Sequence, residues 1–328
     1  MRYVLLGSIQ RAVDRLRVSV QLVEAATGTQ LWAEWFDRRV DHIFALQDEI
    51  ALSLLGALVP GLQRAEIARV HRKGPESLDA YDLVLLSRRD VDSGMPDRVR
   101  RALAALERAV LLEPSYAMAH ANMAMCHHCL FLRGGLKEER RAASIQHARE
   151  AMHHGPDDAT ALALAAFSIG VDGHDRGRAL AAFETALTLS PSCAIALILG
   201  SVVLGWGGEA ARAIEWSERG LRLSPFDPWA FAGYDAQAMS HLLLGDFEEA
   251  SQAAYRSVQA NPSHSITYVQ LAAALAKFGK MSEARAAAAR VLELQPGFRY
   301  GLQFTGVNCA PKLAQVLGEA LGCVGLPA

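Results

Sequence analysis

Two stretches that lie 34 residues apart, ALTLSP (186–191) and GLRLSP (220–225), share one pattern of a small residue, two leucines, a serine and a proline. Their prolines belong to a longer series, spaced by 42, 35, 34, 37 and 34 residues, which comprises Pro114, Pro156, Pro191, Pro225, Pro262 and Pro296. Proline cannot continue a helix, because it lacks the backbone N–H and its ring clashes with the preceding turn. The series therefore predicts helices that end at a nearly constant interval.

Small residues recur at two fixed distances before these prolines. Twelve residues before each proline stand Ala102, Ser144, Ala179, Ala213, Ala250 and Ala284. Five residues before each stand Ala109, Ala151, Ala186, Gly220, Ser257 and Val291, of which only Val291 is bulky. Small side chains allow two helices to approach closely where they cross. The pattern indicates repeated helix pairs rather than an alanine-rich bundle with prolines spaced by chance.

Turn signals divide each repeat into two helices. Gly245 and Gly279 lie where the first helix of a pair should end, and acidic residues follow at the positive N-terminal end of the second helix. We predict six repeats within residues 74–297, at about 77–114, 115–156, 157–191, 192–225, 226–262 and 263–296. The second repeat is the longest, with a loop expected near Arg133. Residues 298–328 should supply a capping amphipathic helix and a tail.

The first 73 residues follow another pattern. Leu16, Val18, Val20 and Leu22 alternate with polar residues, which is typical of a half-buried strand. We predict strands within residues 3–38 and a helix over 41–72. Trp32, Trp35 and Phe36 form either the core of this sheet or a binding patch, and core packing is favoured because aromatic residues are common in strands.

The closing motifs ALTLSP and GLRLSP, together with the 34-residue period, resemble tetratricopeptide repeats. The resemblance implies a mainly α fold, an α-solenoid in which helix pairs form a right-handed superhelix. A small, partial α/β segment precedes it. Such arrays bind protein segments in a concave groove.

The amino-terminal runs resemble a second family. RYVLLGS (2–8), RLRVSVQLVEAATGTQLWAEWFDR (15–38) and DHIFALQDEIA (41–51) are similar to the second half of a TolB-like domain, and PESLDAYDL (75–83) to its junction with tetratricopeptide repeats. Gly325-Leu326-Pro327 resembles the tail of the same bacterial proteins. Many of these carry an upstream class III adenylate cyclase or winged-helix DNA-binding domain. We expect a truncated TolB-like segment whose open sheet edges allow self-association.

Composition narrows the classes of partner. Lys and Arg number 33 against 35 Asp and Glu, a formal charge of −2, and no basic stripe of the kind that binds nucleic acid stands out. No run reaches the roughly 20 apolar residues that a membrane span requires. The five cysteines, at an odd count and without a disulfide spacing, favour a reducing compartment, so we expect a cytoplasmic protein.

No motif predicts catalysis, and we expect no catalytic residue, no cofactor and no metal site. Cys126-His127-His128-Cys129 has the spacing of two zinc ligands, with His120 and His153-His154 nearby. It falls in the middle of a predicted helix, where adjacent residues point in different directions. A structural role is therefore favoured for these residues.

The repeat phase also predicts which residues face the concave side. Positions 30, 27 and 23 residues before a closing proline fall on that face of the first helix. The set, with one nearby base, comprises Ala161, Leu164, Ser168, Ile195, Ile198, Val202, Ala232, Asp235, Met239, Ile266, Val269, Ala273 and Lys277. It is mostly apolar, which favours an apolar or amphipathic partner segment. Packing of helix against helix is an equally good account of the same residues.

Two functions of different class follow. The first is a non-catalytic scaffold for protein interactions, with a regulatory or sensory role. The alternative is the C-terminal regulatory region of a multidomain class III adenylate cyclase, or of a winged-helix regulator, whose effector domain lies outside this chain.

Overall fold

The computed structural model describes residues 3–25, 27–39, 66 and 78–328. The chain divides into two compact units, Met1–Leu78 and Asp79–Ala328. The helix predicted for residues 41–72 lies outside the described residues, apart from Glu66.

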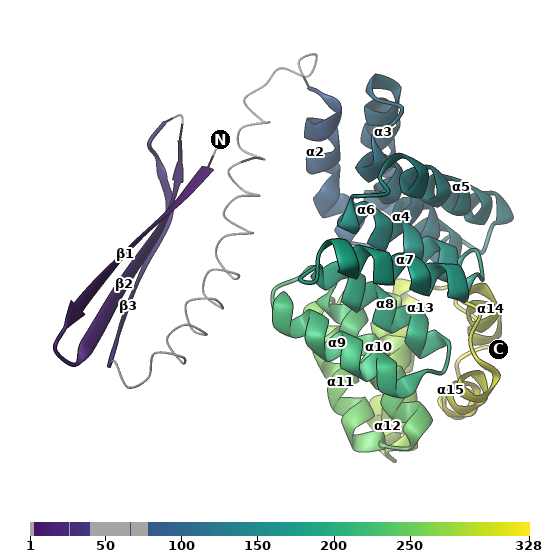
Figure 1. The fold of residues 1–328 in the computed structure, drawn as a ribbon. Helices are drawn as coiled ribbons and strands as arrows, with labels where there is room; N and C mark the ends of the chain where they lie inside the picture. The colour runs from purple at the N-terminus through teal and green to yellow at the C-terminus, as the bar shows by residue number, and fades with distance from the viewer. Residues whose placement is uncertain (1–2, 26, 40–65, 67–77) are drawn as a thin grey trace. The chain divides into compact units, whose positions relative to one another are not determined.

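The first unit contains a three-stranded antiparallel sheet in the order β1-β2-β3. Its strands are β1 (Tyr3–Ala12), β2 (Arg15–Glu24) and β3 (Gln30–Arg39) (Figure 1). The alternation read from the sequence places Val18, Val20 and Phe36 together in a buried cluster, against which Leu16 and Trp32 pack. Salt bridges from Arg15 and Arg17 to Asp37 hold β2 to β3 on the surface.

Trp35 differs from the two aromatic residues beside it. Phe36 is buried and Trp32 packs against the cluster, as core packing requires, but Trp35 is 71% exposed. Successive side chains of a strand point to opposite faces, so Trp32 and Phe36 share one face and Trp35 takes the other. The prediction that all three pack in the core is wrong for Trp35.

The second unit consists of helix pairs. They are α2 (Ala80–Asp92) with α3 (Pro96–Leu112), α4 (Ala117–Arg133) with α5 (Glu138–His154), α6 (Ala159–Val171) with α7 (Arg176–Leu189), α8 (Ala194–Trp206) with α9 (Ala210–Leu223), α10 (Ala230–Leu244) with α11 (Phe247–Ala260), and α12 (Ser265–Lys277) with α13 (Met281–Leu294). The short α14 (Tyr300–Gly306) and α15 (Pro311–Cys323) follow. The predicted fold class, a tetratricopeptide-like helical array after a small sheet, is confirmed.

The small residues of the sequence pattern lie where the helices touch. All twelve positions at the two phases are buried in the structure. Gly220 shows why size matters there, because an added Cβ would stand 2.9 Å from Cγ1 of Ile198 on α8. The closely spaced pairs thus depend on side chains no larger than alanine at most of these points.

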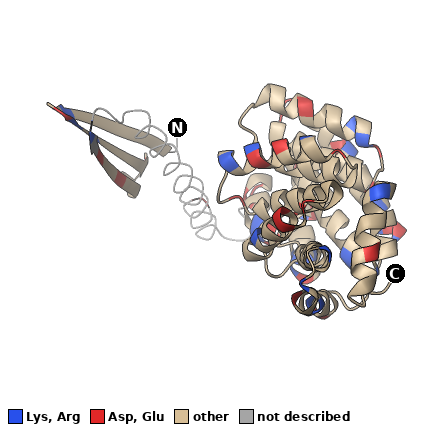
Figure 2. Ribbon diagram, turned by 90° about the horizontal axis from the view of Figure 1, so that it is seen from below, with Lys and Arg blue, Asp and Glu red and all other residues tan. Residues whose placement is uncertain are grey.

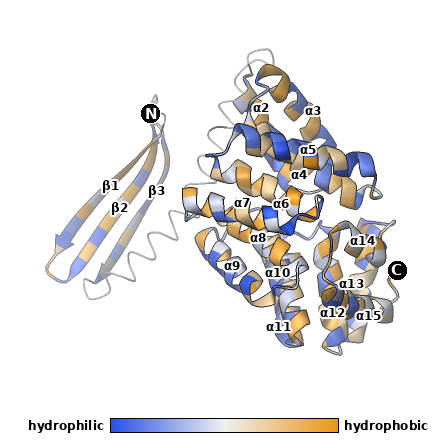
Figure 3. Ribbon diagram, turned by 45° about the vertical axis from the view of Figure 1, so that its right-hand side comes forward, coloured by the Kyte–Doolittle hydropathy of each residue, from blue (hydrophilic) through white to orange (hydrophobic). Residues whose placement is uncertain are grey.

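The first helices of the pairs form the inner layer of the array. Every residue of α6 from Ala161 to Val171, and of α8 from Ala196 to Trp206, is buried. Figure 3 shows both helices as hydrophobic along their length. The second helices, such as α9, are amphipathic and bury only one stripe.

Bonds between residues far apart in sequence close this inner layer. Nε1 of Trp229 donates to Asp92 (2.9 Å), and an Nη of Arg133 donates to the carbonyl of Ser263 (3.2 Å). Near the C-terminus, Arg176 donates to the carbonyl of Asn308 (2.8 Å), and α15 packs against α10 and α12. The early repeats therefore contact the late ones directly. No described helix is long and apolar enough to cross a membrane.

Candidate functional site

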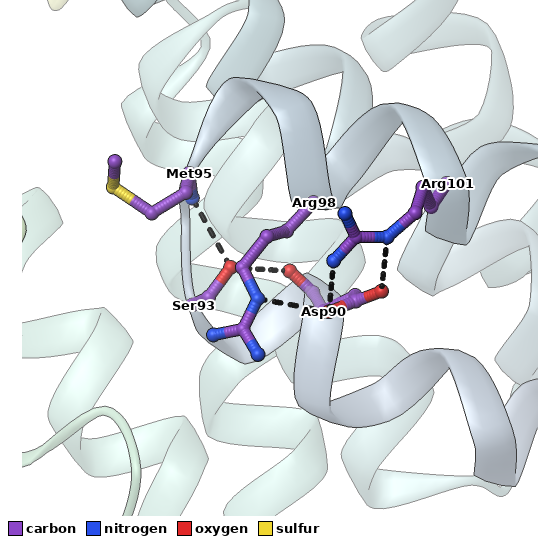
Figure 4. Close-up of polar contacts among 5 residues, drawn as sticks. All are labelled: Asp90, Ser93, Met95, Arg98 and Arg101. Atoms are coloured by element: carbon purple, nitrogen blue, oxygen red, sulfur yellow. Dashed lines mark hydrogen bonds and ion pairs between the residues drawn. The ribbon is translucent and has the colours of Figure 1, made fainter.

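Hydrogen bonds and ion pairs of Asp90 and Ser93 hold the turn between α2 and α3 (Figure 4). Asp90 accepts from Arg98 (3.0 Å) and from Arg101 (3.3 and 3.4 Å), and the hydroxyl of Ser93 accepts from the backbone N–H of Met95 (3.2 Å). These contacts present Gly94 to the interior of the array. Gly94 has φ +59°, and an added Cβ would stand 3.1 Å from the ring of His264.

Behind this turn lies an inner cavity of about 80 Å³, enclosed by α2, α4, α6, α8, α10, α12 and α14. Its wall is largely apolar and aromatic, with Met125, Phe167, Val202, Trp206, Phe231 and Met239. A few polar side chains interrupt that wall, namely His128, Arg133, Asp235, His264 and Gln303. An apolar hollow with a few convergent polar groups is the usual form of a small-molecule site.

Asp235 is the most unusual of these polar groups. Its side chain is 4% exposed, and Oδ1 has no hydrogen-bond partner among the described residues. Burial raises the pKa of Asp235 to about 7, opposed by the nearby hydroxyl of Ser257. That hydroxyl itself donates to the carbonyl of Phe231 (2.9 Å), so Asp235 competes with a backbone acceptor for it.

The two histidines that line the inner cavity differ in their hydrogen bonds. Nδ1 of His128 lies 2.8 Å from Oδ1 of Asp172, whose other oxygen accepts from Ser144. Nδ1 of His264 has no hydrogen-bond partner in the described part of the chain. Burial, with the charges of Arg133 and His128, lowers the pKa of His264 well below its usual value. His264 is therefore neutral at pH 7.

A second hollow, the outer cavity, lies beside the first and measures about 250 Å³. Its aromatic wall comprises Tyr81, Tyr116 and Trp229. The charged residues that line it, within the described ranges, are Asp92, Asp158, Asp227 and Arg88. It thus carries an excess of acidic groups next to aromatic surface.

Asp92 anchors the boundary between the two cavities. Burial raises its pKa to about 6, against the opposing effects of Arg88 and of the hydrogen bond from Trp229. Val91 and Trp229 line both cavities. One layer of side chains therefore separates the inner from the outer cavity.

About half of the predicted groove residues line one of these two cavities. Leu164 and Ile195 line the outer cavity, and Val202, Ala232, Asp235, Met239 and Ile266 line the inner one. The rest line neither, and of these Ala161, Ser168, Ile198, Val269 and Ala273 are buried. Lys277 forms a salt bridge with Glu319 of α15 (2.8 Å). Peptide binding by this set stays a prediction.

Sequence reasoning did not single out Asp92, Trp229, His264 or Gln303. Asp92 and Trp229 are separated by 137 residues, and no local spacing reports such a contact. The sequence contains only a weak signal for Trp229. This aromatic residue directly follows Asp227-Pro228 and precedes an apolar helix, which places it at a turn next to the core.

The side chains of Cys126-His127-His128-Cys129 diverge, as expected for the middle of a helix. His127 stacks on His147, His128 contacts Asp172, and the thiol of Cys129 donates to the carbonyl of Gly94 (2.8 Å). Nδ1 of His120 lies 3.0 Å from Nδ1 of His147. Among the described residues, no group of three or more His, Cys, Asp or Glu has the geometry of a metal site.

Family comparison agrees with the geometry of the pairs. Residues 171–228 and 236–297 match the family model described as tetratricopeptide repeat. This chain carries tetratricopeptide repeats. The two matches begin at the end of α6 and reach just past the end of α13, with a gap at residues 229–235. Most of the wall of both cavities lies outside the matched residues.

One longer protein is similar to part of this chain. A putative adenylate cyclase 3 of Rhizobium meliloti (strain 1021) is 36% identical over 125 residues, which is 38% of this chain and 21% of the cyclase. The match thus spans about a fifth of that protein's length.

Two solved structures share the fold. Human IFIT1, solved as a dimer with m7Gppp-AAAA, has a TM-score of 0.54 at 16% identity, covering 66% of this chain and 50% of that one. The APC/C hetero-tetramer Cut9-Hcn1 has a TM-score of 0.54 at 12% identity, covering 84% of this chain and 49% of that one.

Proposed function

We propose that this chain is a non-catalytic scaffold that binds a protein segment at the outer cavity, in a regulatory or sensory role. The observation that carries the proposal is the lining of that cavity, where aromatic side chains adjoin three carboxylates and a single guanidinium of the described residues. The tetratricopeptide fold supports it, because such arrays present inward surfaces to extended or helical segments.

The charges favour one kind of segment. Asp158 and Asp227 belong to different repeats and line the same hollow as Tyr116 and Trp229. An aromatic wall next to carboxylates suits a lysine or arginine side chain, whose stem packs on the rings while its charge approaches the acids. The proposed partner is therefore an amphipathic segment that carries one lysine or arginine among apolar residues, and not a uniformly apolar segment.

Matched peptides test this function. A fluorescent amphipathic peptide with a central lysine is titrated against the intact chain, beside versions with glutamate or norleucine at that position. We expect the lysine peptide to bind at least about tenfold more tightly, equal to about 1.4 kcal/mol. Asp158→Asn, which retains a residue able to cap α6, should weaken it, and the exposed Glu218→Gln on α9 should not. Equal binding of all three peptides would refute the proposed anchor.

A second candidate function is regulation of an adenylate cyclase. The 36% identity to a putative adenylate cyclase favours it. The purified chain should convert no ATP to cyclic AMP by itself, but should alter the output of a class III cyclase catalytic domain added in trans. Unchanged output at saturating chain concentration would count against this candidate.

The proposal places the chain in the cytoplasm. All five cysteines are free thiols, and Cys126, Cys129 and Cys193 are buried. Thiols persist in a reducing compartment. Self-association through the three-stranded sheet is part of the same proposal, supported by the exposure of Ile9 and Trp35.

A further inference from the structure

The inner cavity combines a dry wall with two polar atoms that lack partners. Oδ1 of Asp235 and Nδ1 of His264 are both buried and accept no hydrogen bond from the described residues. Both residues line the cavity. Buried polar atoms of folded proteins are nearly always paired, so two such atoms on residues that line one hollow point to a missing hydrogen-bonding group.

The remaining wall specifies the body of the missing molecule. Met125, Met239, Phe167 and Trp206 surround the same hollow from four different repeats. Aromatic and thioether groups favour a flat or flexible apolar body. A bound water could pair with the polar side chains but would leave the apolar majority of this wall without a contact.

Size limits the molecule further. The inner cavity measures about 80 Å³, and a single water-sized group occupies roughly 10–15 Å³ on this measure. Room therefore exists for a molecule of about six to eight non-hydrogen atoms. The outer cavity is divided from it by Val91 and Trp229.

We propose that the inner cavity binds a small organic molecule whose apolar body packs on Met125 and Met239 and whose single hydroxyl or amino group donates a hydrogen bond to Asp235. This ligand site is separate from the protein-binding site proposed for the outer cavity. His264, being neutral, provides a second hydrogen-bonding atom from the wall of the same cavity.

Phenol and toluene are the probes that test the site, because they have the same number of heavy atoms and differ in the hydroxyl. Each is titrated into the full chain labelled with ¹³C-methyl methionine. We expect phenol to shift the methyl signals of Met125 and Met239 in a saturable way, with Met152 on α5 as the unaffected internal control. Phenol should bind about tenfold more tightly than toluene, as one added hydrogen bond to a charged group implies.

Two variants complete the experiment. Asp235→Leu keeps the branched shape but removes the acceptor, so toluene should still bind while the preference for phenol falls to about onefold. Val202→Phe fills the cavity and should abolish both shifts. The proposal is overturned if neither probe shifts Met125 and Met239, which would mean that the cavity holds only water. It is also overturned if phenol and toluene bind equally, or if Asp235→Leu retains the preference.

Discussion

Nε1 of Trp229, just before α10, donates a hydrogen bond of 2.9 Å to Oδ1 of Asp92, the last residue of α2. The bond joins the first helix pair to the fifth and forms part of the wall between the inner and outer cavities. Stacking of Trp229 on Phe231 at 5.5 Å orients the indole.

Loss of this bond should destabilise the helical unit. Trp229→Phe removes the N–H but keeps most of the aromatic contact, so the free energy of unfolding should fall by about 1–3 kcal/mol. The pKa of Asp92 should also rise further, because the indole bond holds it down. Urea unfolding measures the first effect. Trp35→Phe, at the exposed tryptophan of the sheet, should change stability by less than about 0.5 kcal/mol.

The stability of the chain should depend on the ionisation of Asp235. Burial raises the folded pKa of Asp235 to about 7, above the ordinary value of 3.8, so folding disfavours the charged form. The resulting penalty is full above pH 7, shrinks as the pH falls, and vanishes below about pH 4. Asp235→Asn should therefore be more stable than the original chain by a few kcal/mol at pH 8 and by little at pH 4. A difference independent of pH would contradict this reading.

The histidine pair His127 and His147 should have the opposite pH dependence. Burial lowers both pKa values to about 4, with added effects of His147 on His127 and of His120 on His147. Between pH 6.5 and 4 the unfolded chain takes up protons that the folded chain refuses, so stability falls by up to about 1.4 kcal/mol per pH unit for each histidine. His147→Asn should lose less stability over this range than the original chain. The exposed His153→Asn serves as the control.

Gly220 should not tolerate a methyl group. Its added Cβ would meet Ile198 at 2.9 Å, Leu197 at 3.1 Å and the carbonyl of Ala194 at 3.2 Å. Gly220→Ala should destabilise the chain by about 1–3 kcal/mol from overpacking, despite the better helix propensity of alanine. Gly177→Ala, in α7, meets nothing closer than 4.0 Å and should be neutral or stabilising. Thermal unfolding of both variants provides the comparison.

Substitution of Ile198 and Met239 tests whether the predicted groove residues line an accessible groove or belong to the core. Both are at most 1% exposed, so a charge at either position would lie in the interior. Ile198→Asp with Met239→Asp should abolish the cooperative unfolding transition, because buried unpaired carboxylates cost several kcal/mol each. A double variant that keeps its helical circular dichroism and melts cooperatively would show that these residues lie on an accessible groove.

Local periodicity predicted the repeat array because each helix pair meets its neighbours through residues at fixed sequence offsets. Ala213 and Gly220 could be placed at contacts from their distance to Pro225 alone. The cavities could not be predicted in this way, because they depend on pairs such as Trp229 and Asp92. These residues are far apart in the sequence and meet only in the folded array. The exposure of Trp35 follows from strand alternation, which puts it on the face opposite Trp32 and Phe36. The prediction missed this because it treated all three aromatic residues of the strand as core.

Basic and acidic residues are interspersed along the described helices (Figure 2). A partner is therefore selected by the local lining of the outer cavity rather than by a surface field of one sign.

The bonds between early and late repeats also bear on how the chain matures during translation. A nascent chain leaves the ribosome N-terminus first, at roughly 5–20 residues per second. Arg133 and Arg176 then emerge well before their acceptors at Ser263 and Asn308. Phe131 and Leu132 at the end of α4, which lie against Gly306 of α14, are therefore covered on that side only after α14 has emerged. A premature stop codon before α14 would leave that side permanently uncovered.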